Sequence, residues 1–201
     1  MRDHFPYVQR VSAYAAAKDV LRKSEEELRA LREAGLQILY LGAESGDEEI
    51  LRHIQKGNTA QEMIEAGRKL HRCGIQTSIT LISGLGGRKG LERHAKESAL
   101  LVNGMNPEYV GLLTLQVSRN TPLAEEIRRG EMELLTADEI AQETEFFLRE
   151  INSPGTVFRS NHASNYVALG GTFNRDIPAL LRTLERVRRE KLYRPDWMRE
   201  L

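Results

Sequence analysis

The sequence predicts an α/β fold in which parallel strands alternate with helices to form half of a TIM-type barrel. Short apolar runs alternate with amphipathic segments over residues 8–117, a pattern typical of βαβ units. Three Ser/Thr-x-x-Glu pairs stand where helices are expected to begin, at Ser24, Thr59 and Thr136. The chain has 201 residues, whereas an eight-stranded barrel typically needs about 250. We therefore expect a partial barrel of four to five parallel strands with a helical C-terminal extension.

The strands and helices can be placed in order along the chain. Gly35 and Gly74 are expected to end two helices, because glycine readily adopts the left-handed conformation found after a helix. A glycine-rich loop is expected at residues 84–90. The predicted strands are residues 8–14, 36–41, 75–82 and 110–117, with 156–160 as a candidate fifth. The predicted helices are residues 24–34, 47–55, 59–73, 91–103, 121–130, 136–151 and 176–191. These elements predict a partial barrel over residues 1–125 and a mostly helical extension, packed on it, over residues 126–201.

Composition argues against several classes of protein. Lys plus Arg and Asp plus Glu both total 29, so nothing indicates the basic surface of a nucleic-acid-binding protein or an attraction to anionic membranes. No apolar run approaches the roughly 18–20 residues of a membrane-spanning helix, and the N-terminus lacks the apolar core of a secretory signal. Cys73 is the single cysteine, which rules out an internal disulfide and fits a cytoplasmic protein. It also rules out a metal site built from several cysteines of this chain.

Candidate ligand-binding residues follow the predicted strands, because parallel α/β folds bind ligands at the carboxyl ends of their strands. Glu44 follows the second strand and can accept two hydrogen bonds from a vicinal diol such as ribose. A cap for the next helix is an equally good explanation of Glu44. The glycines at 84–87 allow a backbone to approach a ring or a phosphate closely, but they also fit a simple turn. They match neither the phosphate-binding loop of nucleotide hydrolases nor the dinucleotide-binding pattern.

A second polar cluster, Asn161-His162-x-x-Asn165-Tyr166, follows the candidate fifth strand. His162 and Asn165 are the candidates for catalytic residues facing a substrate at the barrel mouth. The alternative is a loop held together by its own hydrogen bonds, which is common for polar loop residues.

Several segments together resemble the radical S-adenosylmethionine (SAM) superfamily, in particular the domain type of Elongator protein 3, MiaB and NifB found in coproporphyrinogen-dehydrogenase-like Fe–S oxidoreductases. The segments are LREAGLQILYLGAESGDEEILRHIQKGNT, SITLISGLGG and NPEYVGLLTLQVSRNTPL. The resemblance covers residues 8–125 well and the remainder more loosely. It implies a SAM site of which this chain carries the ribose and adenine side.

The resemblance also implies individual roles. Glu44, with Ser45 beside it, corresponds to the acidic residue near the ribose. Ile82, Gly84 and Gly86 correspond to the strand and turn that pack on the adenine, and Val117 to the last strand at the adenine edge. The third-strand pattern of the family, G-x-I-x-G-x-x-E, reads Thr80-x-Ile82-x-Gly84-x-x-Gly87 here. Its first glycine and its final glutamate are replaced.

The main departure from the family is the absence of its CxxxCxxC motif, which binds a [4Fe–4S] cluster, and of its Gly-Gly-Glu segment. The chain begins where the third strand of the family would begin, so we expect either a fragment of a longer protein or a half-barrel completed from elsewhere. A cluster is expected only if a missing N-terminal segment supplies it, and the chain alone is expected to be inactive. The unpaired sheet edges of a half-barrel favour recruitment of the missing half or homo-oligomerisation.

Two other functions remain open. The first is a degenerate barrel that kept its fold for protein binding, without catalysis. Alternatively, a cluster-free enzyme would bind a phosphate-bearing ligand at residues 84–87, with Glu44 and His162 as its acid–base pair. The sequence does not identify the small-molecule substrate, since fold alone does not fix function.

Overall fold

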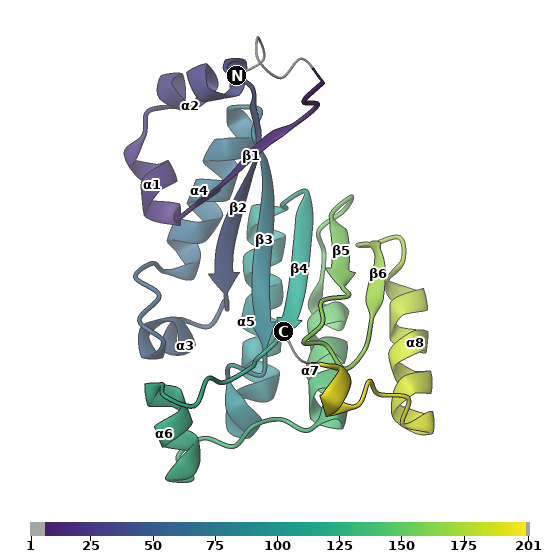
Figure 1. Cartoon of the computed structure of the whole chain (residues 1–201). Coiled ribbons are helices and arrows are strands. Elements are labelled where there is room, and N and C mark those ends of the chain that lie inside the picture. Colours follow the sequence, from purple (N-terminus) through teal and green to yellow (C-terminus); the bar gives the residue numbers. More distant parts are fainter. Residues whose placement is uncertain (1–6, 200–201) are drawn as a thin grey trace.

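The computed structural model describes residues 7–199 and contains one six-stranded sheet whose strands lie in chain order (Figure 1). Strands β1 to β5 are parallel, and β6 runs antiparallel to β5 at one edge. The strands are Val11–Ala15 (β1), Leu36–Glu44 (β2), Gln76–Ser83 (β3), Tyr109–Thr114 (β4), Val157–Ser160 (β5) and Leu169–Thr172 (β6). The predicted α/β half-barrel is therefore confirmed, with five parallel strands.

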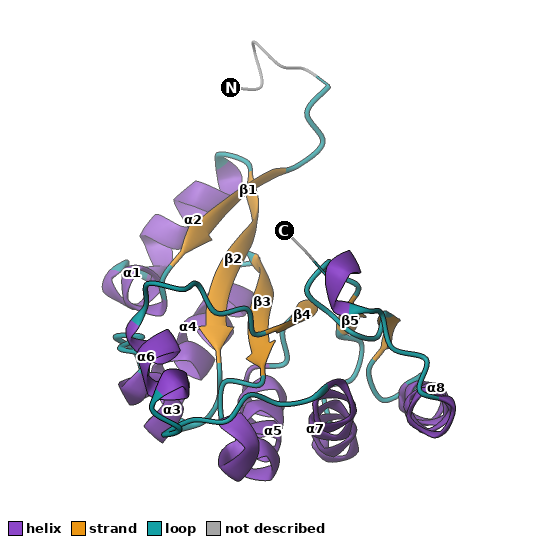
Figure 2. Cartoon of the chain, turned by 60° about the horizontal axis from the view of Figure 1, so that its bottom comes forward, coloured by secondary structure: helices purple, strands orange, loops and turns teal. Residues whose placement is uncertain are grey.

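The helices lie on one side of this curved sheet and leave its other side open (Figure 2). They are Ala17–Arg22 (α1), Glu25–Glu33 (α2), Glu48–His53 (α3), Ala60–Arg72 (α4), Gly87–Met105 (α5), Pro122–Arg128 (α6), Ala137–Glu150 (α7) and Ile177–Glu190 (α8). The short 3₁₀ helix Asp196–Met198 (η1) follows α8 and does not belong to this layer (Figure 2). We call the face of the sheet that lacks helices the inner face, because it corresponds to the interior of a closed barrel.

The alternation of side chains along each strand separates the two faces. Ile79, Leu81, Val110 and Phe158 are buried and belong to one hydrophobic core with residues of the helices. The residues between them, such as Ile82, are only half-buried and face the open side. This two-residue period is what a strand imposes on successive side chains.

Local sequence signals set most helix boundaries. Ser24, Thr59 and Thr136 each accept a hydrogen bond from the backbone N–H three residues later, and the glutamate there bonds back, which confirms all three predicted capping boxes. Gly35 and Gly74 have φ values of 114° and 73°, as expected for glycines that follow a helix.

Several predicted boundaries were wrong, and three elements were not predicted. Strand β2 continues to Glu44, and β4 ends at Thr114 instead of residue 117. Helix α5 begins at Gly87, so it takes up part of the predicted glycine-rich loop. Helix α1, strand β6 and the 3₁₀ helix η1 are the unpredicted elements. The sheet itself continues past residue 125 through β5 and β6, and the division of the chain at that residue stays a prediction.

None of the helices within residues 7–199 combines the length and the apolar character needed to cross a membrane.

A cluster of charged groups joins α7 to α8 and to the segment that follows it. Asp138 lies 2.7 Å from both Lys191 Nζ and Tyr193 Oη, and 3.4 Å from Arg188. The hydrogen bond from Lys191, followed by that from Tyr193, lowers the pKa of Asp138 from 3.8 to about 2. Burial, followed by the hydrogen bond to Asp138, raises the pKa of Tyr193 to about 12. The phenol therefore stays neutral and donates to the carboxylate.

We predict that Asp138 stabilises the protein in a pH-dependent way. Because its folded pKa is depressed, the stabilisation is present above its ordinary pKa of 3.8 and is lost as the pH falls through about 2. Asp138→Asn should therefore lower the free energy of unfolding near neutral pH, and the difference from the parent protein should shrink between about pH 4 and pH 2. Urea unfolding at several pH values measures this, and an equal difference at every pH would contradict it.

Candidate functional site

The carboxyl ends of the parallel strands form the edge where the sequence places its candidate residues. After β4 the chain runs back across this edge to α6, which lies below α3 (Figure 1). The segment that crosses the edge covers residues 115–121 and includes Val117. The site therefore combines strand ends, the turns that follow them and this crossing segment.

Glu44 ends β2 in a strained turn. The Ser45 backbone N–H donates to the carbonyl of Ala43 across 2.8 Å, which closes a three-residue turn centred on Glu44. Glu44 has a φ of 63°, a left-handed conformation that is uncommon for residues other than glycine. The pairing of β2 with β3 shifts register at the same place. Such strain costs about 1–3 kcal/mol and is often found at functional sites.

The turn directs the carboxylate of Glu44 back over the sheet, where it meets Lys56. Glu44 Oε1 lies 2.8 Å from Lys56 Nζ, and both side chains are about one-fifth exposed, at 21% and 24%. A Cβ atom on Gly42 would lie 2.4 Å from Glu44 Oε1 and 3.1 Å from Lys56 Nζ. The absence of a side chain at Gly42 is therefore what allows the ion pair to sit close against the sheet.

Ile82 lies on the inner face of β3, next to Leu113 of β4. These two residues are register partners, and both are half-buried. Side by side they form an apolar surface of the kind on which a flat ring packs. This surface lies one strand away from the end of β2, where Glu44 is located.

The glycine turn after β3 has a defined conformation. Gly84 has a φ of 92°, and a Cβ atom there would lie 3.2 Å from Ile140 Cδ1. Gly86 precedes the first residue of α5, and a Cβ atom there would lie 3.1 Å from Gly90 and His94. The lack of a side chain at both glycines thus allows the turn to pack closely against α5 and α7.

Ser45 is fully buried, and its hydroxyl oxygen accepts a hydrogen bond from the Asp47 N–H at 2.9 Å. Asp47 caps α3 by accepting from the Glu49 N–H at 2.8 Å. Ser45 therefore supports the turn between Glu44 and α3 from within the protein, while the Glu44 carboxylate remains accessible.

Val117 lines a cavity of about 400 Å³ between the C-terminal end of α3 and the crossing segment. This volume falls within the range of small-molecule sites, about 300–1,000 Å³. His53 and Glu126 line one side of the cavity and are joined by a hydrogen bond of 2.8 Å. The other lining residues are Ile54, Gln55, Gln116, Ser118, Thr121, Pro122 and Leu123.

Asn165 and His162 both follow β5, as predicted, but the surroundings of their two side chains differ. Asn165 is buried, and its amide nitrogen donates to the Leu112 carbonyl at 2.8 Å and to Ser160 Oγ at 3.0 Å. Its oxygen accepts from the Thr114 hydroxyl at 3.0 Å. These bonds join the ends of β4 and β5. His162 is half-buried, and its Nδ1 accepts from the Ser164 N–H at 3.2 Å.

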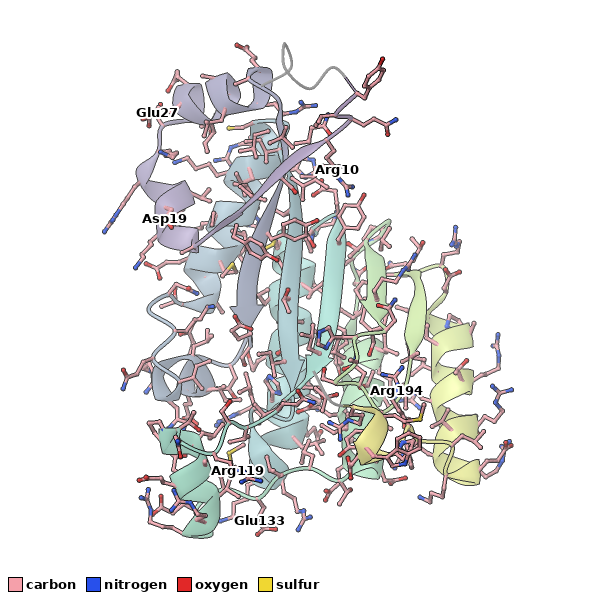
Figure 3. All side chains as sticks on the ribbon, in the orientation of Figure 1. Arg10, Asp19, Glu27, Arg119, Glu133 and Arg194 are labelled. Atoms are coloured by element: carbon pink, nitrogen blue, oxygen red, sulfur yellow. The ribbon has the colours of Figure 1, made fainter. Side chains whose placement is uncertain are left out.

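The C-terminal segment holds this loop from the other side. Arg194, labelled in Figure 3, donates to the carbonyls of His162 and Ala163 at 3.1 and 2.9 Å. Arg199 donates to the Ser164 carbonyl at 2.7 Å, and its guanidinium lies 3.4 Å from the centre of the Tyr166 ring. Two arginines thus fix the loop after β5 next to the crossing segment.

The structure brings some of the predicted residues together and separates others. Glu44 ends β2, Ile82 lies on the adjacent strand β3, and Gly84 directly follows β3. His162 follows β5, which is three strands away from β2. With neighbouring strands about 4.8 Å apart, these strand ends are separated by roughly 14 Å. Glu44 and His162 are therefore not placed to exchange a proton directly.

The chain lacks the ligands for an iron–sulfur cluster. Clusters of this kind are held by several cysteine thiolates, whereas Cys73 is the single cysteine of the sequence. Cys73 is buried at the end of α4, just before β3 begins, and so lies at the edge of the sheet opposite Glu44. Within residues 7–199 no three His, Cys, Asp or Glu residues gather as a metal site.

No local feature of the sequence indicates a role for Lys56 or Leu113. The Lys56-Gly57 pair contributed to the family resemblance, but nothing local shows that Lys56 reaches across α3 to Glu44. Leu113 appeared as one of several apolar residues in a strand. Its pairing with Ile82 depends on the register of β3 against β4.

We predict that the conformation of Glu44 costs stability, which glycine would restore. Because glycine adopts positive φ without strain, Glu44→Gly should unfold with a free energy about 1 kcal/mol higher than Glu44→Ala. Both variants remove the carboxylate, so their difference reports the backbone strain less the extra conformational entropy of glycine in the unfolded chain. Urea unfolding of the two variants measures this difference, and equal stabilities would contradict the predicted gain.

Comparisons with known proteins support the fold and the family resemblance. Residues 13–96 match the family model of the radical SAM superfamily. The chain is similar to the structure of Elp3 from the archaeon Methanocaldococcus infernus, with a TM-score of 0.63 and 19% identity over 91% of this chain and 42% of that one. It is also similar to methylornithine synthase (PylB), with a TM-score of 0.51 and 18% identity over 89% of this chain and 57% of that one.

The chain therefore spans less than two thirds of either structure, and at these identities the likeness shows the fold. No curated protein matches the sequence. Residues 13–96, which include the first three strands and most of the helices around them, are thus the part of the chain that matches the radical SAM superfamily.

Proposed function

We propose that this chain forms the ribose and adenine side of a SAM site in a radical SAM enzyme. The observation that carries the proposal is the Glu44–Lys56 pair, held over Gly42 by a strained turn, next to the apolar surface of Ile82 and Leu113. A pair of charges beside an apolar surface suits a ligand that has both a polar sugar and a flat ring.

Each residue has a distinct task in this proposal. The carboxylate of Glu44 accepts hydrogen bonds from the two ribose hydroxyl groups, as a carboxylate with two oxygens can. Lys56 pairs with Glu44 and offers a positive charge to the carboxylate of the methionine part. Ile82 and Leu113 pack on the adenine, and Val117 borders the ring from the crossing segment.

The electron that cleaves SAM in this superfamily comes from a [4Fe–4S] cluster, for which this chain has no set of thiolates. We therefore propose that the cluster is supplied by protein outside this sequence. The chain binds and orients SAM, and the cysteine-bearing part completes the catalytic centre.

The edge of the sheet at β1 supports this association. A groove of about 470 Å³ runs between β1 and α2, lined largely by apolar residues such as Val11, Val20, Leu28 and Leu31. Tyr14 of β1 is 88% exposed and packs on Tyr40, with ring centres 5.3 Å apart. An exposed parallel edge with apolar neighbours favours pairing with a further strand. We propose that the missing half of the barrel docks there.

We predict that the purified chain binds SAM and that Glu44→Ala weakens binding about tenfold or more, since charge-assisted hydrogen bonds each contribute about 1.5–3 kcal/mol. Calorimetry measures both dissociation constants. Glu49→Gln is a matched control, because Glu49 is a carboxylate on α3, five residues away, whose side chain is 63% exposed and bonds to Arg93.

Binding that is weakened equally by Glu44→Ala and Glu49→Gln would place the ligand elsewhere. Absence of binding by the parent chain, in the presence and absence of added cluster-bearing protein, would contradict the proposal. It would favour a degenerate barrel that acts as a protein-binding chain.

A further inference from the structure

A buried carboxylate lies behind the glycine turn of the site. Glu143 of α7 and His94 of α5 have side chains that are each only 4% exposed, and Glu143 Oε1 lies 2.8 Å from His94 Nδ1. Glu143 Oε2 accepts the Gly84 N–H at 2.8 Å and also the hydroxyl of Ser83. The carboxylate thus bonds to both residues at which β3 passes into the turn.

Burying a charge is costly unless hydrogen bonds compensate it. Glu143 has three such partners, contributed by β3, by the turn and by α5. His94 Nε2 has no hydrogen-bond partner within residues 7–199, although it is buried. Leaving a buried nitrogen unpaired also costs free energy. The hydrogen bond between His94 Nδ1 and Glu143 is therefore the polar contact that offsets the burial of His94.

The same contacts extend to the crossing segment. The Ser83 carbonyl accepts the N–H of Leu115 at 2.9 Å, two residues before Val117. Helix α7 also holds the turn at a second point, through Ile140 against Gly84. The buried carboxylate therefore lies at the junction of the two segments that carry Ile82 and Val117.

The neighbouring residue on α7 shows that burial alone does not produce such contacts. Thr144 is also buried, but its hydroxyl donates to the Ile140 carbonyl of its own helix at 2.9 Å. Glu143 instead bonds to the backbone of the turn. Its contacts are directed at the conformation of the site.

We propose that Glu143 is a positioning residue of the SAM site, oriented by His94, which holds the β3–α5 turn and the crossing segment in the conformation that receives the adenine. The inference rests on the function proposed above. Glu143 does not touch the ligand. It accepts the N–H of Gly84 from the helix side of the turn, and this contact holds Ile82 and the ligand-facing side of the turn in a constant position.

The test compares Glu143→Gln with Thr144→Val, the matched control on the same helix. Calorimetry gives SAM affinity, thermal unfolding gives stability, and NMR hydrogen exchange gives the protection of the Gly84 and Leu115 amides. Glu143→Gln should weaken SAM binding about tenfold or more and speed exchange at both amides, because a buried charged acceptor is lost. Thr144→Val should bind SAM as the parent does, even where it loses similar stability.

A second pair of variants tests the role of His94. Asparagine can place a donor where His94 Nδ1 lies, whereas alanine cannot. His94→Asn should therefore retain SAM affinity and Gly84 protection, and His94→Ala should lose both. This rescue distinguishes positioning from general support of the core, because both variants remove the same ring from the interior.

Parent-like SAM affinity in Glu143→Gln, or an equal loss in Thr144→Val, would overturn the proposal. If the parent chain binds no SAM, the function proposed above fails, and the exchange data decide this inference alone. Unchanged exchange at Gly84 in Glu143→Gln would then overturn it. If Glu143→Gln does not fold, the His94 pair decides, and equal behaviour of its two members counts against the proposal.

Discussion

The unequal covering of the two faces of the sheet is the constraint on which the rest of the structure depends. Side chains alternate along β2, β3 and β4, so every second residue enters the core beneath the helices. The residues between them are left on the open inner face. Leu81 and Leu112 point into the core, so their neighbours Ile82 and Leu113 are available to a ligand. A shift of one residue in register would exchange these roles.

The strand ends of the site are held by two different means. Glu44 lies in a three-residue turn with positive φ, closed by a bond between its neighbours and open to Lys56. The end of β3 is instead held from behind, by the buried carboxylate of Glu143. Both arrangements cost free energy, one through backbone strain and the other through desolvation of a charge. Neither is needed to bury apolar surface, which supports a functional reason for them.

The features predicted correctly from the sequence are those that depend on neighbouring residues. The capping boxes at Ser24, Thr59 and Thr136 and the glycines at 35 and 74 require only local hydrogen bonds and local φ values. Strand β6 contains two glycines in four residues, and this segment is a strand because it pairs with β5. Its sequence alone therefore favours a loop.

The site was predicted only in part for the same reason. Glu44, Ile82, Gly84 and Val117 follow from the resemblance and from the rule that ligands bind at strand ends. Lys56 reaches Glu44 across a whole helix, and Glu143 reaches Gly84 from 59 residues away. On an amphipathic helix a glutamate such as Glu143 is normally expected at the surface. Only the packing of α7 against the sheet reveals that it is buried.

The most direct test of this account is an NMR titration of the ¹⁵N-labelled chain with SAM, which maps where the ligand contacts the protein. The account predicts that amide shifts change at Glu44, Ile82, Gly84 and Val117, at the carboxyl ends of the strands. Amides of the groove beside β1, such as those of Val11 and Leu28, should not respond. Shifts confined to that groove, or to the amino ends of the strands, would contradict the central claim that the inner face at the carboxyl edge is the ligand site.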